Sequence, residues 1–195
     1  MKVYQANEIK NIALLGNDGA GKTTLTESLL FESGIIKRRG RITMKNTVSD
    51  YFPVEQEYGY SVFSTVYHVE YNNKKLNIID CPGSDDFVGG AMTALGVTDT
   101  AVLLLNGQYG PEVGTQNHFR YTEKLKKPVI FLVNQLDSDK CDYNQVLVFP
   151  ISIFPKSLHV TLVKFLTSFT TRIIAMIQIK FRSRLLIQLL CLIFC

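Results

Sequence analysis

The fold of this chain is decided by the stretch Ile9–Thr23, which reads Ile-Lys-Asn-Ile-Ala-Leu-Leu-Gly-Asn-Asp-Gly-Ala-Gly-Lys-Thr. Its first seven residues are mostly apolar and predict a short buried strand. The next eight fit the pattern G-x-x-x-x-G-K-[ST], and leucines at helical spacing predict a helix over Thr23–Glu32. A strand, a glycine-rich turn and a helix in this order form the context that a phosphate-binding loop requires.

The chemistry expected of this loop follows from its backbone and from its last two side chains. Glycines let the backbone wrap closely around oxygen atoms, so that successive N–H groups and the helix N-terminus face the β-phosphate of a nucleotide. Lys22 is placed to reach the β- and γ-phosphate oxygens, and the Thr23 hydroxyl is placed to bind Mg²⁺. The nucleotide-binding residues predicted here are Asn17, Asp18, Gly19, Ala20, Gly21, Lys22, Thr23 and Thr24.

A second motif closes the predicted strand Lys75–Asp80. The residues from Asp80 to Gly83 fit D-x-x-G, which by itself is also compatible with a strand end and an ordinary turn. Beside a phosphate loop, Asp80 is expected to hold magnesium through water. The backbone N–H of Gly83 is expected to meet the γ-phosphate, where a side chain would crowd it.

A third motif, N-x-x-D, occupies Asn134–Asp137 after the predicted strand Pro128–Val133. Asp137 can accept hydrogen bonds from N1–H and from the 2-amino group of guanine, whereas adenine presents the wrong pattern. Asn134 is expected to brace the phosphate loop. Gln135 replaces the usual lysine, whose stem stacks on the base, so a lower affinity is expected. The three motifs together predict a GTP/GDP site with Mg²⁺.

The remaining pattern predicts the fold class. Strands are predicted over Ser61–Tyr71, Lys75–Asp80, Thr100–Leu105 and Pro128–Val133, with a helix over Thr115–Lys126. The turn signal Asn72-Asn73 makes the first two strands an antiparallel hairpin. The polar segment Lys37–Tyr60 is predicted to be a long mobile loop. We therefore expect an α/β fold, the three-layer α/β/α sandwich of P-loop NTPases, with a mainly parallel sheet that is incomplete at its C-terminal end.

Stretches around these motifs carry a resemblance to a known family. Glu55–Val62 resembles E-x-E-R-G-I-T-I, Cys81–Phe87 resembles T-P-G-H-x-D-F, and Asn106–Gln116 resembles D-A-x-x-G-V-x-x-Q-T. Residues 6–142 thus resemble the GTP-binding domain of a translational GTPase of the elongation factor G type, in particular the divergent second copy found in some bacteria. The resemblance implies a GTPase that works with the ribosome as its partner.

The departures from this family concern three positions. Ser61 takes the place of a magnesium-binding threonine, so the resemblance implies Thr23, Ser61 and Asp80 as the metal site. Tyr58 replaces an arginine. Ser84, next to Gly83 in the catalytic segment, takes the place of the histidine that orients the attacking water. Because a short neutral serine cannot position water in the same way, we expect slow or absent hydrolysis.

Three functions stay open at this point. The first is a translational GTP-binding domain with weak turnover. The second is a non-hydrolysing module that binds the ribosome in a nucleotide-dependent way. The third is a membrane-associated fragment that uses the end of the chain.

Composition divides the chain into a partial GTP-binding domain over residues 1–142 and a tail over residues 143–195. The first part holds 15 Lys and Arg and all 17 Asp and Glu, whereas the tail holds 6 basic residues, no acidic residue and no glycine. At average usage, 53 residues would carry roughly four glycines and about six acidic residues. The basic pI therefore reflects the tail, and DNA is not expected as a partner.

Location follows from the start of the chain and from cysteine usage. Met1–Asn11 lacks the apolar core of a signal peptide, and four scattered cysteines favour a reducing cytoplasm. His68 and His118 have no neighbours at ligand spacing and are assigned structural roles.

The tail allows three interpretations, which are an out-of-frame continuation, a membrane-associated segment and an unusual folded ending. No convincing strand or helix of the family is found in it. A membrane span is disfavoured because basic residues interrupt the apolar stretches, and Leu185–Cys195 is too short for a bilayer of ~30 Å. An out-of-frame continuation accounts best for the sudden change in composition.

Sequencing of the coding DNA around the codons for Val146 and Leu147 tests this interpretation. A frameshift predicts that a neighbouring reading frame continues with family-like sequence, including the last strand and helix of the domain. If no neighbouring frame encodes such a sequence, the frameshift interpretation is wrong.

Overall fold

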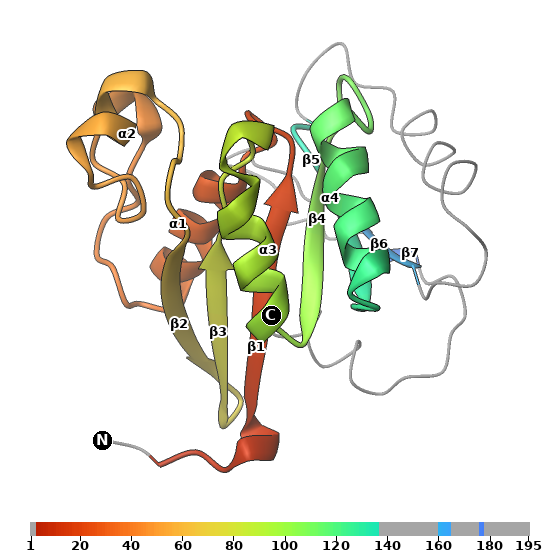
Figure 1. Cartoon of the computed structure of the whole chain (residues 1–195). Coiled ribbons are helices and arrows are strands. Elements are labelled where there is room, and N and C mark those ends of the chain that lie inside the picture. The colour runs from red at the N-terminus through yellow and green to blue at the C-terminus, as the bar shows by residue number, and fades with distance from the viewer. Residues whose placement is uncertain (1–2, 137–159, 165–175, 178–195) are drawn as a thin grey trace.

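The computed structural model describes residues 3–136, 160–164 and 176–177 (Figure 1). Among these residues, the strands form one sheet in the order β2-β3-β1-β4-β5-β6-β7. The strands are β1 Ile9–Gly16, β2 Thr65–Tyr71, β3 Lys74–Asp80, β4 Thr100–Asn106, β5 Val129–Asn134, β6 Val160–Lys164 and β7 Met176–Ile177. The outer strand β2 pairs antiparallel with β3, and the outer strand β7 pairs antiparallel with β6. All other neighbouring strands pair in parallel.

Helices cover both faces of this sheet. The α-helices are α1 Lys22–Glu32, α2 Pro53–Tyr58, α3 Val88–Val97 and α4 Val113–Lys124. Short 3-10 helices occur at η1 Ala6–Glu8, η2 Ile42–Met44 and η3 Asp85–Phe87. Helices α3 and α4 lie in front of the sheet in Figure 1 and α1 lies behind it. The predicted three-layer α/β/α sandwich is confirmed.

The core consists of two apolar layers, one on each face of the sheet. Every residue of β4 and β5 is buried, as expected for parallel strands covered on both sides. Because side chains alternate along a strand, Phe131 packs on Phe119 of α4 with ring centroids 5.8 Å apart, while Leu132 belongs to the opposite layer with Leu25 and Leu30 of α1. This packing fixes both helices against the sheet.

The order of the strands also places the turn between β1 and α1. The chain leaves β1 toward α1, and β1 lies between β3 and β4. Leu14 pairs in register with Asp80, the last residue of β3, and Gly16 pairs with Leu104 of β4. In open α/β sheets, ligands bind at the carboxyl ends of strands where the strand order reverses, which is the end where the phosphate loop lies.

The prediction that Lys37–Tyr60 is entirely a loop is wrong, because η2 and α2 lie within it. Pro53 stands at the first position of α2, where its fixed φ favours the helix and its missing N–H costs nothing. Gly59, with φ of 75°, ends the helix. Helix propensity summed over so few residues is a weak signal, so the sequence pattern gives little indication of α2.

The predicted strand Ser61–Tyr71 also starts too early, since β2 begins at Thr65. The N–H groups of Val62 and Phe63 each donate to Glu55 Oε1 at 3.0 Å instead of joining the sheet. A buried carboxylate thus replaces the sheet partner of these residues.

Three further elements, α3, β6 and β7, were not expected. Helix α3 is rich in glycine and alanine and shows no clear helical pattern of large apolar residues. Strands β6 and β7 fall within the tail, where no strand was predicted, and β6 pairs in parallel with β5. The predicted boundary at residues 142–143 lies outside the described residues. Within the described part of the chain, no helix is long and apolar enough to cross a membrane.

Candidate nucleotide-binding site

The glycines of the phosphate loop are required by close packing at its two ends. Gly16 has φ of 136°, and a Cβ there would lie 2.6 Å from the carbonyl oxygen of Leu104. Gly21 has φ of 91°, and a Cβ there would lie 2.3 Å from Asn134 Nδ2. A Cβ at Gly16 would meet the backbone of β4, and a Cβ at Gly21 would displace the Asn134 amide, so with their positive φ both positions favour glycine.

Lys22 points back over the loop that precedes it. Its Nζ donates to the carbonyl oxygens of Gly16 at 3.0 Å and Asn17 at 2.9 Å. Burial lowers the pKa of Lys22, and the negative charges of Asp80 and Asp18 oppose that shift. A buried ammonium group held by neutral carbonyls is poised to receive an anionic partner.

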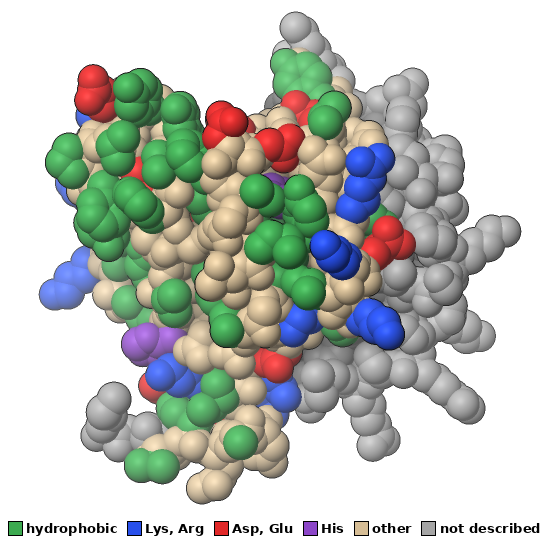
Figure 2. All heavy atoms as spheres, viewed as in Figure 1, with side chains coloured by type: hydrophobic (Ala, Val, Ile, Leu, Met, Phe, Trp, Pro, Cys, Tyr) green, Lys and Arg blue, Asp and Glu red, His purple; other side chains and the backbone are tan. Residues whose placement is uncertain are grey.

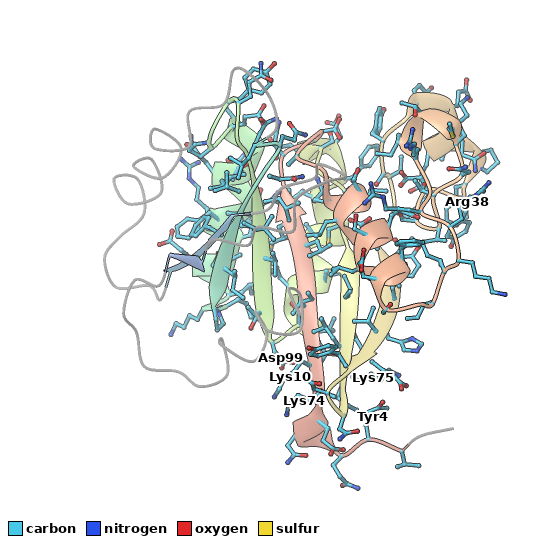
Figure 3. The ribbon with its side chains drawn as sticks, turned by 180° about the vertical axis from the view of Figure 1, so that it is seen from behind. Tyr4, Lys10, Arg38, Lys74, Lys75 and Asp99 are labelled. Atoms are coloured by element: carbon cyan, nitrogen blue, oxygen red, sulfur yellow. The ribbon has the colours of Figure 1, made fainter. Side chains whose placement is uncertain are left out.

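The basic side chains carried by β1 and β3 lie far from this loop. Lys10, Lys74 and Lys75 cluster with Asp99 at the opposite end of the sheet, where the parallel strands begin (Figure 3). Among these residues, Lys22 at the start of α1 therefore supplies positive charge at the phosphate loop, whereas the lysines of β1 and β3 do not.

Residues from the end of β5 support the loop from the other side. Asn134 Nδ2 donates to Ala20 O at 2.9 Å, and Gln135 Nε2 donates to Gly19 O at 2.7 Å. Gln135 adopts φ of 59°, which turns its side chain toward the loop. Asp137, the residue predicted to read guanine, lies outside the described residues.

The three predicted magnesium ligands meet in one place. Thr23 Oγ1 donates to Asp80 Oδ2 at 3.1 Å and lies 3.2 Å from Ser61 Oγ. Asp80 is only 1% exposed, and burial raises its pKa to about 7, although Lys22 and the Thr23 hydroxyl favour the charged form. Asp80 Oδ1 is buried and makes no hydrogen bond of regular geometry in the described part of the chain, although the buried Ser49 hydroxyl also favours the charged form of Asp80.

These residues fit a magnesium ion. Mg²⁺ prefers oxygen ligands and binds through one or two protein oxygens plus water and phosphate. The cluster offers two hydroxyl groups and the Asp80 carboxylate, of which Oδ1 makes no hydrogen bond of regular geometry in the described residues. A bound cation would offset the cost of burying the negative charge of this carboxylate. Oxygen chemistry and the buried Asp80 Oδ1 therefore both suit the predicted metal.

Asp50 belongs to the same cluster and was missed by the sequence analysis. Its Oδ1 accepts a hydrogen bond from Ser61 Oγ at 2.8 Å, and its Oδ2 is buried without a partner in the described residues. Burial raises the pKa of Asp50, and the Ser61 hydroxyl opposes the shift. No motif marks Asp50, because it lies in the irregular segment and reaches the site only through the fold.

The D-x-x-G turn approaches the loop closely. A Cβ on Gly83 would lie 2.4 Å from Lys22 Nζ and 2.6 Å from the backbone nitrogen of Asp18. Ser84 follows at the start of η3, where its hydroxyl accepts from Asp86 N at 3.3 Å. The serine side chain therefore caps a turn, at the position where the family resemblance implies an imidazole. Thr24, the last of the predicted nucleotide-binding residues of the loop, is exposed on the first turn of α1.

The segment of residues 37–64 between α1 and β2, here called the switch segment, presents an apolar outer surface. Figure 2 shows hydrophobic side chains gathered over the α2 region. Tyr51 stacks near Phe52, and Phe52 near Phe63, with ring centroids 4.4 and 4.8 Å apart. All three rings are exposed, so aromatic packing holds this surface together without burying it.

His118 supports the start of the phosphate loop and goes beyond the structural role assigned from sequence. Its Nδ1 accepts a hydrogen bond from the backbone N–H of Gly16 at 3.2 Å, and Thr115, one turn earlier, accepts from Asn17 N at 3.3 Å. Burial lowers the pKa of His118 to about 4, and the positive charge of Lys22 adds to this shift. The imidazole therefore stays neutral, as its acceptor role demands.

A glycine-rich loop at the switch point of a parallel sheet, with a buried lysine over its carbonyls, places the chain among the P-loop nucleotide-binding proteins. A family profile described as "Elongation factor Tu GTP binding domain" matches residues 7–156. The chain belongs to this family and carries the GTP-binding domain of translational GTPases.

Individual relatives agree with this assignment. The mitochondrial ribosome-releasing factor 2 of Candida dubliniensis is 35% identical over 143 residues, which are 73% of this chain and 18% of that protein. The elongation factor G-like protein of Thermotoga maritima is 32% identical over 139 residues, 71% of this chain and 20% of that protein. A crystal structure from Thermus thermophilus matches with a TM-score of 0.72 and 34% identity, over 74% of this chain and 22% of its own. The chain thus spans about a fifth of the length of such relatives.

The buried imidazole predicts a pH-dependent stability. Because the pKa of His118 is about 4 in the folded chain and about 6.5 when unfolded, the unfolded state binds the proton first. The contribution of His118 to the free energy of unfolding should therefore fall as the pH drops from about 6.5 toward 4, by on the order of 3 kcal/mol, whereas the raised pKa of Asp80 acts in the opposite direction in wild type and variant alike. Denaturant unfolding at pH 7.5 and 4.5 should show a smaller loss for His118→Asn, which keeps an acceptor but cannot titrate.

The exposed His68 supplies the control, since His68→Asn should leave the pH dependence of the wild type intact. Equal pH dependence in wild type and His118→Asn would contradict the role given to His118.

Proposed function

We infer that this chain binds GTP or GDP with Mg²⁺ as the nucleotide-binding domain of an elongation factor G-like protein, and that it hydrolyses GTP slowly. The observation that carries the proposal is the meeting of Thr23, Ser61 and Asp80 beside Lys22. Lys22 and the N–H groups of Gly19, Gly21 and neighbouring loop residues would hold the phosphates. Thr23, Ser61 and Asp80 would hold the ion, which neutralises charge on the phosphate oxygens when bound.

Choice of base rests on the end of β5. Asn134 and Gln135 tie the phosphate loop to the end of this strand, which supports a role for the N-x-x-D motif in nucleotide binding. We propose that Asp137 accepts both hydrogen bonds of guanine. Since Gln135 is engaged with Gly19 O, its short stem covers less of the base than a lysine stem, which supports a lowered affinity.

Weak turnover is proposed from Ser84. A water molecule attacking the γ-phosphate needs a group that orients it, and positioning supplies much of the rate of phosphoryl transfer. The Ser84 hydroxyl is short and accepts the Asp86 N–H, which supports the loss of that function. The same observation favours a second candidate, a module that binds nucleotide and the ribosome without hydrolysis. The ribosome enters this proposal through the family, since one relative is named as a ribosome-releasing factor.

A competition titration tests the nucleotide assignment. A fluorescent GTP analogue should bind the full chain in the presence of Mg²⁺, and unlabelled GTP or GDP should displace it. ATP should compete at least about 100-fold more weakly, because adenine leaves the Asp137 carboxylate without its two donors. Equal competition by ATP would contradict the guanine assignment.

Multiple-turnover phosphate release with and without ribosomes tests the hydrolysis proposal. The wild type should turn over slowly in both conditions. Ser84→His should raise the ribosome-stimulated rate by about tenfold or more if the other catalytic parts are intact, and Ser84→Ala should not. A wild-type rate equal to that of an ordinary elongation factor would refute weak hydrolysis, and no release in any variant would favour the non-hydrolysing module.

A further inference from the structure

We propose that Glu27 is a positioning residue that holds the switch segment against α1, so that Asp50 and Ser61 reach the magnesium site. This inference rests on the proposed nucleotide function and deepens it. Glu27 lies four residues after Thr23 in α1, and residues at this spacing share one face of a helix. The metal ligand and the buried carboxylate therefore face the same neighbour, which is the switch segment.

The Glu27 carboxylate binds the switch segment at two points. Its Oε2 accepts the backbone N–H of Gly40 at 2.7 Å, and its Oε1 accepts the backbone N–H of Val48. Glu27 is only 1% exposed. One buried carboxylate thus closes residues 40–48 into a loop and attaches both ends of that loop to α1. Hydrogen bonds to an ionised acceptor are about twice as strong as neutral ones.

Close packing at Gly40 makes this contact specific. A Cβ there would lie 2.5 Å from Asn46 O, 2.7 Å from Thr47 Cα and 2.9 Å from Glu27 Oε2. The side chain of Glu27 can reach the Gly40 N–H only because the position carries no side chain. Gly40 also lies beside exposed basic residues, among them Arg38, which Figure 3 shows on the outer side of this segment.

The contact leads directly to the metal site. Both backbone polar groups of Val48 are engaged, since its N–H donates to Glu27 and its carbonyl oxygen accepts from Tyr67 OH of β2 at 2.7 Å. Asp50 follows two residues later and accepts from Ser61, which in turn lies 3.2 Å from Thr23. These contacts form a closed path that leaves α1 at Glu27, follows the switch segment to Asp50 and Ser61, and returns to α1 at Thr23. Glu27 fixes the end of this path that lies away from Thr23.

A second buried carboxylate fixes the segment on the other side of Ser61. Glu55 is fully buried and accepts the N–H groups of Val62 and Phe63, the two residues after Ser61. Its contacts lie within the switch segment, whereas those of Glu27 join the segment to the helix that follows the phosphate loop. Of these two carboxylates, Glu27 is therefore the one that couples the segment to α1.

The test compares affinity with and without Mg²⁺ in the full chain. In Glu27→Gln, the amide oxygen can accept one N–H, but its NH₂ group faces the other, so one contact is lost. Binding of a fluorescent non-hydrolysable GTP analogue in EDTA should stay unchanged, because Lys22 and the phosphate loop are untouched. The gain in affinity on adding Mg²⁺ should fall about tenfold. In the nucleotide-free chain, trypsin should cut faster at the basic residues 37–45.

Two variants complete the design. Gly40→Ala should reproduce both effects from the switch side without altering α1, and it serves if Glu27→Gln does not fold. Glu32→Gln, which removes an exposed carboxylate at the end of the same helix, should behave as the wild type.

The outcomes separate the two proposals. An undiminished Mg²⁺ gain with unchanged proteolysis in Glu27→Gln and Gly40→Ala would overturn the role of Glu27. An equal loss in EDTA and in Mg²⁺ would also overturn it, because that result indicates a general structural role. A wild-type chain that binds no GTP analogue would refute the proposed function, and the proteolysis of the nucleotide-free chain would still decide the role of Glu27.

Discussion

A carboxylate buried at the end of a strand, Asp80, is the constraint around which the site is built. Burial raises its pKa to about 7, and the Thr23 hydroxyl and the nearby Lys22 charge offset part of the cost of ionisation. One oxygen of Asp80 makes no hydrogen bond of regular geometry in the described part of the chain. A protein retains such a group at a cost in stability, and a bound cation relieves that cost. Pairing of β1 with β3 holds the group in place, since it sets Asp80 level with Leu14.

The surrounding structure serves to keep polar groups aimed at this place. Asn134, Gln135 and His118 each hold a different part of the phosphate loop, from β5, from the turn after β5 and from α4. Glu27 and Glu55 hold the switch segment by accepting its backbone N–H groups. The site thus depends on side chains that bind protein backbone rather than nucleotide. These supporting side chains determine how well the residues that bind phosphate and metal are positioned.

The sequence predicted those parts of the fold that a local pattern specifies. Strand, loop and helix at Ile9–Glu32 follow from hydrophobic spacing and a motif of fixed length, and β3, β4 and β5 follow from apolar runs. Helix α2 could not be predicted in this way, because it depends on Pro53, Gly59 and tertiary contacts rather than on periodicity. The strands of the tail were missed for another reason, since the composition of residues 143–195 suggested that no family-like element would be found there.

The site was predicted to a similar extent. Thr23, Asp80 and Ser61 came from motif position, and the structure brings them together. Asp50, Glu27 and His118 contribute through contacts between residues 11 to 102 positions apart in sequence, for which no local pattern exists.

The central claim is that Thr23, Ser61 and Asp80 form a divalent cation site that is completed by nucleotide. Electron paramagnetic resonance of Mn²⁺ titrated into the full chain, with and without a non-hydrolysable GTP analogue, tests it most directly. About one tightly bound ion per chain is expected only when the nucleotide is present, and binding should be about tenfold weaker or more in Asp80→Asn. Tight Mn²⁺ binding that needs no nucleotide, or that is unaffected by Asp80→Asn, would refute this cation site.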